Sequence, residues 1–245
     1  MSQIKKQKQA NVFDRLEDGD IIDRSQPSVR PKDAATLILI RRDGPKPRVL
    51  VGKRSNKHAF MPDKYVFPGG RVDPEDSRAP AITELRAPVE QKLVQGARRK
   101  PRAFGLTAVR ETFEETGLII GQPDANGATA PRNWQPFLEE GALPCLQHLE
   151  FVGRAITPPY RPKRFDARFF IAEAETALID ERPAASGAEL VDVRWIELDD
   201  TRDIDLPLVT LQMLDEVRQR LEAPKDPHQP LFLRYSPKGH LVERI

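Results

Sequence analysis

One helical segment constrains this chain more than any other feature, because its two faces suit opposite environments. Thr107 is expected to cap the segment at its start, and Gly117 stands where helices commonly end on a left-handed glycine. With a rotation of about 100° per residue, three large apolar side chains fall on one face: Leu106, Val109 and Phe113. The segment is therefore predicted to be a helix that buries this face in a core.

The other face of this helix carries three carboxylates, Glu111, Glu114 and Glu115, within an arc of about 100°. Like charges at this spacing repel, so a cation is expected beside them. Oxygen ligands without histidine or cysteine favour Mg²⁺ or Mn²⁺, and Mg²⁺ typically shares carboxylates with substrate phosphates. Arg110 lies four residues before Glu114 and can fix the orientation of that carboxylate. Taken alone, the pattern also fits a solvated acidic helix face.

The segments before the helix predict the start of a sheet. The aliphatic run 34–40, the turn residues 43–47 and the run 48–53 together predict a hairpin, and a short strand is expected at 65–67. That strand leads directly into Pro68-Gly69-Gly70, where two glycines allow backbone angles that other residues adopt only at a cost. A special loop is therefore expected at the end of the strand.

The remaining segments predict more strands and several helices. Strands are indicated by β-branched and aromatic residues, and helices by apolar residues at helical spacing. In chain order, the expected elements are a short helix at 87–95, a loop at 121–136, a short helix at 137–143, strands at 149–156, 168–174 and 191–196, a helix at 206–221, and a terminal hairpin at 231–235 and 240–242.

Length and composition limit the class of protein. The 245 residues suit one large domain with additions as well as two small ones. We expect an arm at 1–32, a domain at 33–223 and a hairpin extension at 224–245. The single Cys145 excludes an intrachain disulfide framework and fits a reducing compartment, and no apolar run is long enough for a membrane helix. A cytoplasmic protein without a membrane partner is expected.

The charge of the chain argues against nucleic acid as a partner. Lys and Arg total 39 against 37 Asp and Glu, which gives a formal net charge of +2. The basic cluster 98–102 could contact a second phosphate or RNA, but a solvated surface run is the favoured interpretation. For Arg161, Lys163 and Arg164, contact with an acidic substrate and structural ion pairing are equally open, and Arg164 is the preferred substrate residue.

The carboxylate helix also carries a motif. Its segment Arg110-Glu-Thr-Phe-Glu-Glu-Thr-Gly-Leu118 resembles the second half of the Nudix box, which reads Gly, five residues, Glu, seven residues, then Arg-Glu-U-x-Glu-Glu-x-Gly-U with U aliphatic. The segment Gly70-Arg-Val-Asp-Pro-Glu-Asp76 looks like the first half and follows Phe67-Pro-Gly. Asp76 stands where the box has Glu, and Thr112 stands where it has an aliphatic residue. The resemblance covers about 34–221.

The two halves of the box are unusually far apart. Between Asp76 and Arg110 lie 33 residues where the box has seven, which places an insertion at about 77–105. This interruption, together with Arg164-Phe-Asp-Ala-Arg-Phe-Phe170, resembles the Nudix branch related to peroxisomal coenzyme A diphosphatases. Members that cleave coenzyme A also carry an upstream signature. Arg54-Ser55 matches its start, but Ala59 and Asp63 occupy the places of its second Arg and its Gly.

The resemblance implies an α/β/α Nudix sandwich with a mixed β-sheet and a helical insertion within the box. It also implies roles for single residues. The metal ligands would be Glu111, Glu114, Glu115 and the carbonyl of Gly70, the catalytic residues Glu111, Arg110 and Glu189, and the substrate-binding residues Arg54, Arg164 and Gly69. Glu111 is the first choice for the general base and Glu189 the second.

The implied activity is hydrolysis of the pyrophosphate bond of a nucleoside diphosphate linked to another group, with Mg²⁺ or Mn²⁺ as cofactor. Coenzyme A or an acyl-coenzyme A is the suspected substrate. The alternatives are ADP-ribose, NADH, a nucleotide sugar or capped RNA, or a non-catalytic module that senses a nucleotide. The insertion could either cap the pocket or build a homodimer interface.

Overall fold

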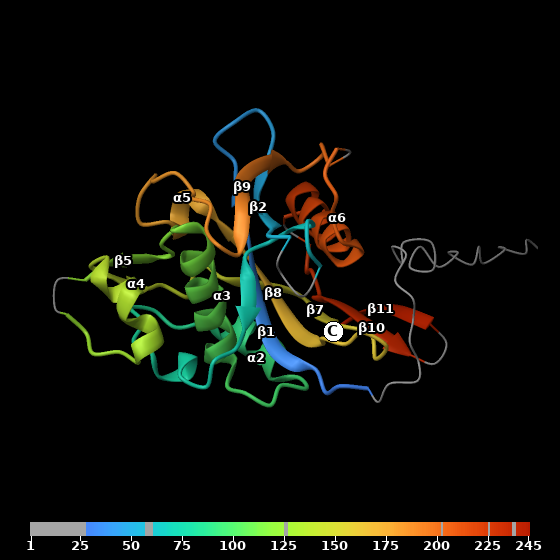
Figure 1. Ribbon diagram of the computed structural model, residues 1–245, viewed down its shortest axis with the longest axis horizontal. Coiled ribbons are helices and arrows are strands. Elements are labelled where there is room, and N and C mark those ends of the chain that lie inside the picture. The colour runs from blue at the N-terminus through green and yellow to red at the C-terminus, as the bar shows by residue number, and fades with distance from the viewer. Residues whose placement is uncertain (1–27, 57–60, 125–126, 202, 225, 237–238) are drawn as a thin grey trace, which may run out of the picture.

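The fold is built on one mixed sheet, seen in a computed structural model that describes residues 28–56, 61–124, 127–201, 203–224, 226–236 and 239–245 (Figure 1). Among these residues the large sheet has nine strands. Its main path runs β11-β10-β7-β8-β1-β2-β3, while β4 pairs with β1 and β9 pairs with β2. The pairs β1 with β8 and β7 with β10 are parallel and the others are antiparallel. The mixed sheet predicted from the sequence is thus confirmed.

The strands have the following bounds: β1 Lys32–Arg41, β2 Arg48–Arg54, β3 Tyr65–Val66, β4 Gly69–Arg71, β5 Gly121–Pro123, β6 Ala142–Pro144, β7 Glu150–Ile156, β8 Phe165–Glu173, β9 Leu190–Glu197, β10 Leu231–Ser236 and β11 Gly239–Arg244. The helices are η1 Asp76–Arg78, α2 Ala87–Val94, α3 Pro101–Thr116, η2 Arg132–Trp134, α4 Gln135–Glu139, α5 Ala174–Ala177 and α6 Leu208–Glu222. None of the helices among the described residues is long and apolar enough to cross a membrane.

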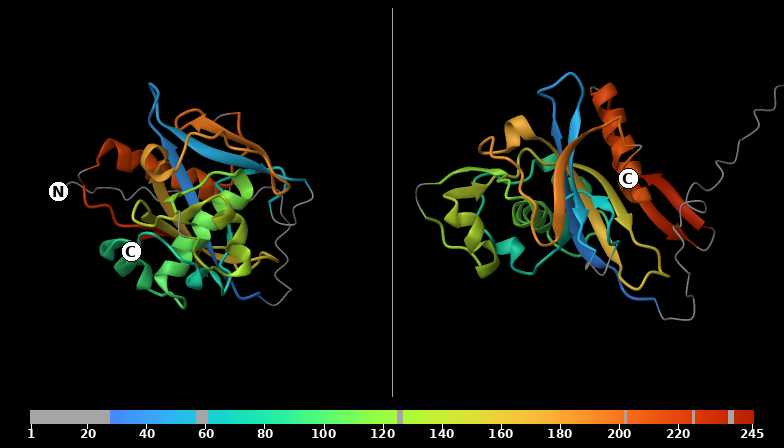
Figure 2. Two further views of the ribbon diagram at one scale, coloured as in Figure 1. Left: turned by 90° about the vertical axis from the view of Figure 1, so that its left-hand side faces the viewer. Right: turned by 45° about the horizontal axis from the view of Figure 1, so that its top comes forward.

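Strand β1 is buried on both faces because its apolar residues alternate between two cores. Ala35, Leu37 and Leu39 pack with α3, whereas Ile38 and Ile40 pack with α6. Successive side chains of a strand point to opposite faces, so one continuous aliphatic run serves both cores. Figure 2 shows α3 and α6 on opposite sides of the sheet. The chain therefore has the α/β/α layers expected of it.

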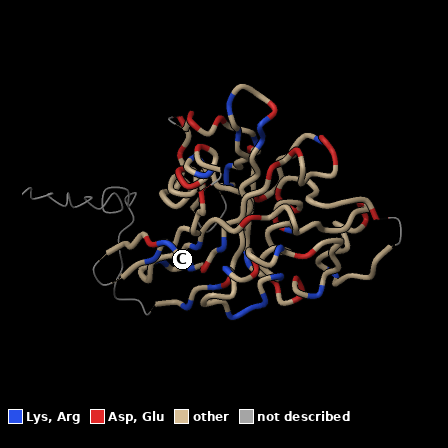
Figure 3. Tube along the Cα trace, turned by 180° about the vertical axis from the view of Figure 1, so that it is seen from behind, with Lys and Arg blue, Asp and Glu red and all other residues tan. Residues whose placement is uncertain are grey.

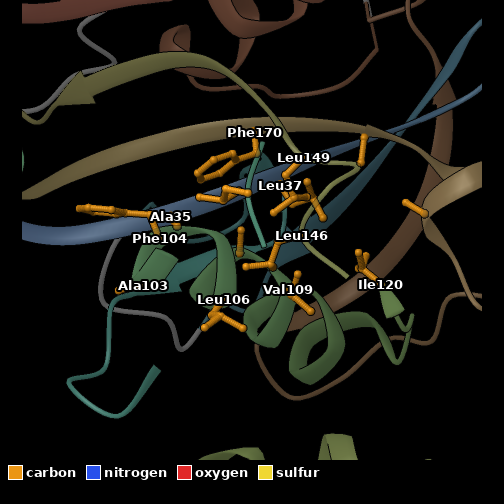
Figure 4. Close-up of a cluster of buried hydrophobic side chains, with 14 of the residues drawn as sticks. Ala35, Leu37, Ala103, Phe104, Leu106, Val109, Ile120, Leu146, Leu149 and Phe170 are labelled. Atoms are coloured by element: carbon orange, nitrogen blue, oxygen red, sulfur yellow. The ribbon is translucent and has the colours of Figure 1, made fainter. Parts of the chain in front are cut away.

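The core between the sheet and α3 fixes the position of that helix. Phe104, Leu106 and Val109 of α3 are fully buried and belong to one core cluster with the sheet residues Leu37 and Phe170 (Figure 4). Each large apolar side chain buried in this way contributes about 1.5–3 kcal/mol. The buried apolar face leaves the opposite face of α3 turned toward β4.

The start of α3 differs from the prediction. Thr107 does not cap the helix, since α3 begins at Pro101, and the Thr107 hydroxyl donates to the Ala103 carbonyl from inside the helix, at 2.7 Å. Proline suits the first helical position because its missing N–H would have no partner there. The expected end is confirmed, because Gly117 has a φ of 72° and its N–H donates to the Phe113 carbonyl. The expected insertion at 77–105 thus includes the first turn of α3.

The segment after α3 also differs from the prediction. The loop expected at 121–136 contains β5 and η2, and the short helix expected at 137–143 is α4, after which β6 pairs with β5. A pairing between segments about twenty residues apart leaves little trace in local sequence. The terminal hairpin forms as predicted, and β10 joins the large sheet in parallel with β7. Most of the arm expected at 1–32 lies outside the described residues, and Lys32 already belongs to β1.

Candidate active site

The site is built where the C-terminal half of α3 meets the glycine loop. Strand β4 pairs with β1 so that Gly69 lies opposite Thr36 and Gly70 opposite Ala35. The N–H of Gly69 donates to Glu115 Oε2 at 2.9 Å. A Cβ at Gly70 would collide with the Glu111 carboxylate, which comes within 2.6 Å of the place it would occupy. A Cβ at Gly69 would collide with the backbone of Ala35 and Thr36 at 2.5 and 2.7 Å, so Gly69 has to be glycine, whereas a Cβ at Gly70 would displace the Glu111 carboxylate.

Burial raises the pKa values of these carboxylates. Desolvation raises the pKa of Glu111 to about 7, and the neighbouring Glu114 adds to this shift while Arg110 opposes it. The pKa of Glu115 is raised to about 8, again mainly by burial, and that of Glu114 is raised for the same reason. Three acids that are costly to ionise together form a site whose charge calls for a cation.

Arg110 is the cation that the chain itself supplies. Its Nη1 lies 2.8 Å from Glu111 Oε1 and 2.9 Å from Glu114 Oε2. Its Nε donates to Asp76 Oδ1 at 2.8 Å, and its Nη2 donates to the Arg71 carbonyl at 3.2 Å. Burial alone would lower the pKa of Arg110, but the surrounding carboxylates raise it above its ordinary value. Arg110 thus holds the first half of the box against the second.

Asp76 anchors Arg110 from the other side. It is fully buried, and besides Arg110 its carboxylate accepts hydrogen bonds from Thr107 Oγ1 at 2.7 Å and from Trp134 Nε1 at 3.1 Å. Asn133 Nδ2 donates to the same carboxylate at 3.3 Å, and the N–H of Asp73 donates at 2.9 Å. No local pattern in the sequence marks Trp134 or Asn133 as a partner of Asp76, because only the fold brings η2 to the start of the box. Asp76 at the acidic position of the box is the one signal that pointed here.

Two further predicted residues lie beside the carboxylates. Strands β2 and β9 pair so that Arg54 lies opposite Leu190, and the N–H of Ser55 donates to the Glu189 carbonyl at 2.9 Å. The charges of both Arg54 and Glu189 act on the pKa of Glu115. The structure therefore brings Arg54 and Glu189 toward the same site as Glu111, Glu114, Glu115 and the two glycines.

Arg164 is engaged elsewhere. Its guanidinium donates to the carbonyls of Thr157 and Val29 and to the hydroxyl of Ser28, at 2.7 to 2.9 Å. None of these partners is one of the three acids of α3. These bonds tie the turn before β8 to the chain that leads into β1, and contact of Arg164 with a substrate stays a prediction.

One residue of the upstream signature has a backbone conformation that suits the signature's glycine. Asp63 stands where the signature has glycine, and its φ of 61° lies in the left-handed region that favours glycine. Aspartate adopts this region more readily than most residues. Ala59, the other departure from the signature, lies outside the described residues.

A divalent cation fits the donor set of this site. Glu111, Glu114, Glu115 and the Gly70 carbonyl offer hard oxygens, and the Glu111 carboxylate lies directly against the Gly70 backbone. Among the residues that the structure describes, no three acidic, imidazole or thiol groups converge on one point at metal-binding distance. Glu111 and Glu114 instead contact Arg110, and Glu115 contacts Gly69. Binding of a metal ion would require the side chains of Glu111, Glu114 and Glu115 to turn toward one common point.

Comparison with known proteins places the chain near the Nudix hydrolases, although no family model matches it. A curated protein of Caenorhabditis elegans named "Putative nudix hydrolase 7" is 28% identical over 163 residues, which cover 61% of this chain and 46% of that protein. The chicken (Gallus gallus) acyl-coenzyme A diphosphatase NUDT19 is 26% identical over 188 residues, with 52% of this chain and 48% of that protein covered. The chain spans about half the length of these relatives.

A solved structure supports the same relationship. The crystal structure of a Nudix hydrolase from Alicyclobacillus acidocaldarius superposes with a TM-score of 0.57 at 28% identity, covering 76% of this chain and 90% of the other. Sequence and fold therefore agree: the chain has the Nudix fold and resembles Nudix hydrolases, with a specific likeness to acyl-coenzyme A diphosphatases.

Proposed function

We propose that this chain, which has the fold and the box of a Nudix hydrolase, hydrolyses the pyrophosphate bond of a nucleoside diphosphate linked to another group, with a divalent metal ion as cofactor. One observation carries the proposal. The glycine loop and the C-terminal half of α3 bring two buried carboxylates with raised pKa values against the Gly69 N–H and the Gly70 backbone. A purely structural helix face would gain nothing from burying such charges.

The roles of the residues follow from their contacts. When bound by Glu111, Glu114, Glu115 and the Gly70 carbonyl, Mg²⁺ or Mn²⁺ would neutralise phosphoryl charge and acidify a coordinated water. Glu111 is the proposed general base, because a carboxylate beside the metal can take the proton of a coordinated water. Arg110 orients Glu111 and Glu114, and Asp76 holds Arg110 in place. Glu189 is the alternative base, since its charge reaches Glu115.

Coenzyme A or an acyl-coenzyme A is the proposed substrate. The likeness to the acyl-coenzyme A diphosphatases supports it, as do the position of Arg54 beside the carboxylates and the glycine-like backbone of Asp63. A different nucleoside diphosphate derivative, such as ADP-ribose, NADH, a nucleotide sugar or capped RNA, would use the same machinery. A non-catalytic sensor would have no need of three acids on one helix face.

A substrate panel tests the proposal. Coenzyme A, an acyl-coenzyme A, ADP-ribose, NADH, a nucleotide sugar and capped RNA are each incubated with Mg²⁺ and then with Mn²⁺, and the products are identified by chromatography. Release of adenosine 3′,5′-bisphosphate and a phosphopantetheine supports the proposed substrate. Cleavage of another compound alone keeps the reaction and discards coenzyme A, whereas no cleavage of any compound with either metal contradicts the proposed reaction.

A further inference from the structure

A second basic site lies next to the box, at the far end of α3. A cavity of about 590 Å³ opens between the start of β1, the end of β4 and the loop that joins α2 to α3. Such a volume is large enough for a nucleotide-sized ligand. Six basic residues line it: Arg30, Lys32, Arg71, Arg98, Arg99 and Arg154. Blue positions gather along the lower edge of the trace in Figure 3, in keeping with a basic face there.

The acidic residues of the cavity do not balance this charge. Only Asp33 and Asp166 line it. Asp33 is engaged by Arg99 at 3.1 Å, and Asp166 is engaged by Arg154 at 2.7 Å. Arg30, Lys32 and Arg71 line the same cavity, and none of these three forms an ion pair with a residue that the structure describes. The cavity thus keeps a surplus of positive charge.

A buried arginine behind the cavity wall adds to the surplus. Arg168 is 1% exposed and stacks over the Phe104 ring at 4.7 Å. Its Nη1 contacts Asp166, the carboxylate that Arg154 already uses, while its Nη2 has no hydrogen-bond partner. Burial lowers the pKa of Arg168 to about 10. Two arginines therefore share one acid at this wall, an arrangement that a further anion would balance.

The cavity lies close to the site on α3 and is separate from it. Arg71 directly follows Gly70, and Asp33 lies two residues before Ala35, the partner of Gly70, which corresponds to about 7 Å along β1. Along α3, the rise from Pro101 to Glu111 is about 15 Å. None of the three carboxylates of α3 lines the cavity, and one extended molecule could occupy both places.

From this convergence we propose that the cavity, to which the insertion within the box contributes Arg98 and Arg99, is a second anion-binding site that holds a phosphate group. Guanidinium groups match the geometry of phosphate oxygens, and the cavity gathers them from four separate segments of the chain. The phosphate can belong to the substrate or to a separate phosphorylated ligand. The first of these sources rests on the proposed function, whereas the binding itself does not.

Ligand binding without metal tests the proposal. Adenosine 3′,5′-bisphosphate and adenosine 5′-monophosphate, which differ by one phosphate, are titrated by calorimetry into the full chain in the presence of a chelator. The variant K32Q/R98Q removes two exposed charges from the cavity. The variant R42Q/K46Q removes the same two kinds of charge from the exposed tip of the β1–β2 hairpin and serves as its control.

The proposal expects the bisphosphate to bind more tightly than the monophosphate. K32Q/R98Q is expected to weaken binding of the bisphosphate by about tenfold or more, since each lost contact to a charged group costs about that factor in affinity. R42Q/K46Q is expected to change the affinity by less than about twofold. Equal losses in both variants, no binding by the wild-type chain, or binding of single-stranded RNA in place of the small phosphates would each overturn it.

Turnover then identifies the source of the phosphate. If the group belongs to the substrate, K32Q/R98Q raises KM and leaves kcat unchanged. If it belongs to a separate ligand, KM is unchanged while the loss of bisphosphate binding persists. An inactive wild-type chain that still binds the bisphosphate refutes the proposed hydrolysis alone, and an active chain that does not bind it refutes the second site alone.

Discussion

Replacement of Asp76 by Asn gives the sharpest test of how the site is held together. The Asp76 carboxylate is fully buried and accepts hydrogen bonds from Arg110, Thr107 and Trp134, among others. Asparagine has nearly the same shape but removes the charge and turns one acceptor into a donor. Arg110 then stays buried without its main partner, and in either orientation the amide NH2 meets an N–H donor of Arg110, Trp134 or Asp73.

The expected cost follows from the burial of the pair. Loss of one partner from a buried ion pair typically destabilises a protein by about 3–5 kcal/mol. For a chain of this length that corresponds to a fall in Tm of about 6–20 °C. Turnover should fall as well, because Arg110 orients Glu111 and Glu114.

Urea unfolding of wild type and D76N measures this cost. E75Q is the matched control, since the adjacent Glu75 forms an ion pair with Arg78 whose side chains are 38% and 67% exposed. Such exposed pairs contribute about 1 kcal/mol or less. A loss of less than about 1 kcal/mol in D76N, or an equal loss in both variants, would refute the role of Asp76 as the anchor of Arg110.

Two further perturbations test other parts of the account. Saturation with Mn²⁺ at about 100 times its Kd should raise the free energy of unfolding by about 2.7 kcal/mol, and G70A should reduce this gain because its Cβ would displace the Glu111 carboxylate. A G70A chain stabilised as much as wild type would contradict the geometry. E216Q should cost about 3 kcal/mol in a denaturant titration, because the buried Glu216 pairs with Arg220 and with Arg244 of β11. Unchanged hydrogen exchange in β11 would contradict that role.

Local patterns of the sequence predicted most strands of the large sheet and the grouping of the three acids on α3. The aliphatic run of β1 and the three acids of α3 are features of single segments, and their spacing is sufficient to place them. The meeting of Gly70 with Glu111 was expected only from the resemblance to the box. For these residues the structure adds burial, distances and the direction of each pKa shift.

Contacts between distant segments could not be predicted in this way. Trp134 meets Asp76 across 58 residues of chain, and no local pattern marks either residue for the other. The basic cluster 98–102 was interpreted as a solvated surface run. Only the fold shows that Arg98 and Arg99 line one cavity together with Arg154. Arg164 was a substrate candidate because its neighbours in the sequence suggested it, yet its bonds lead to the start of β1. The expected cytoplasmic location and homodimer remain predictions.

The central claim is that the acids of α3 drive metal-dependent hydrolysis. Its most direct test is turnover of the best substrate in wild type, E114Q and E115Q, with E139Q in the short helix α4 as the control and thermal unfolding as the check on folding. The account predicts that E114Q and E115Q lose metal-dependent turnover while they keep the fold, and that E139Q stays active. Full activity in both α3 variants would contradict it.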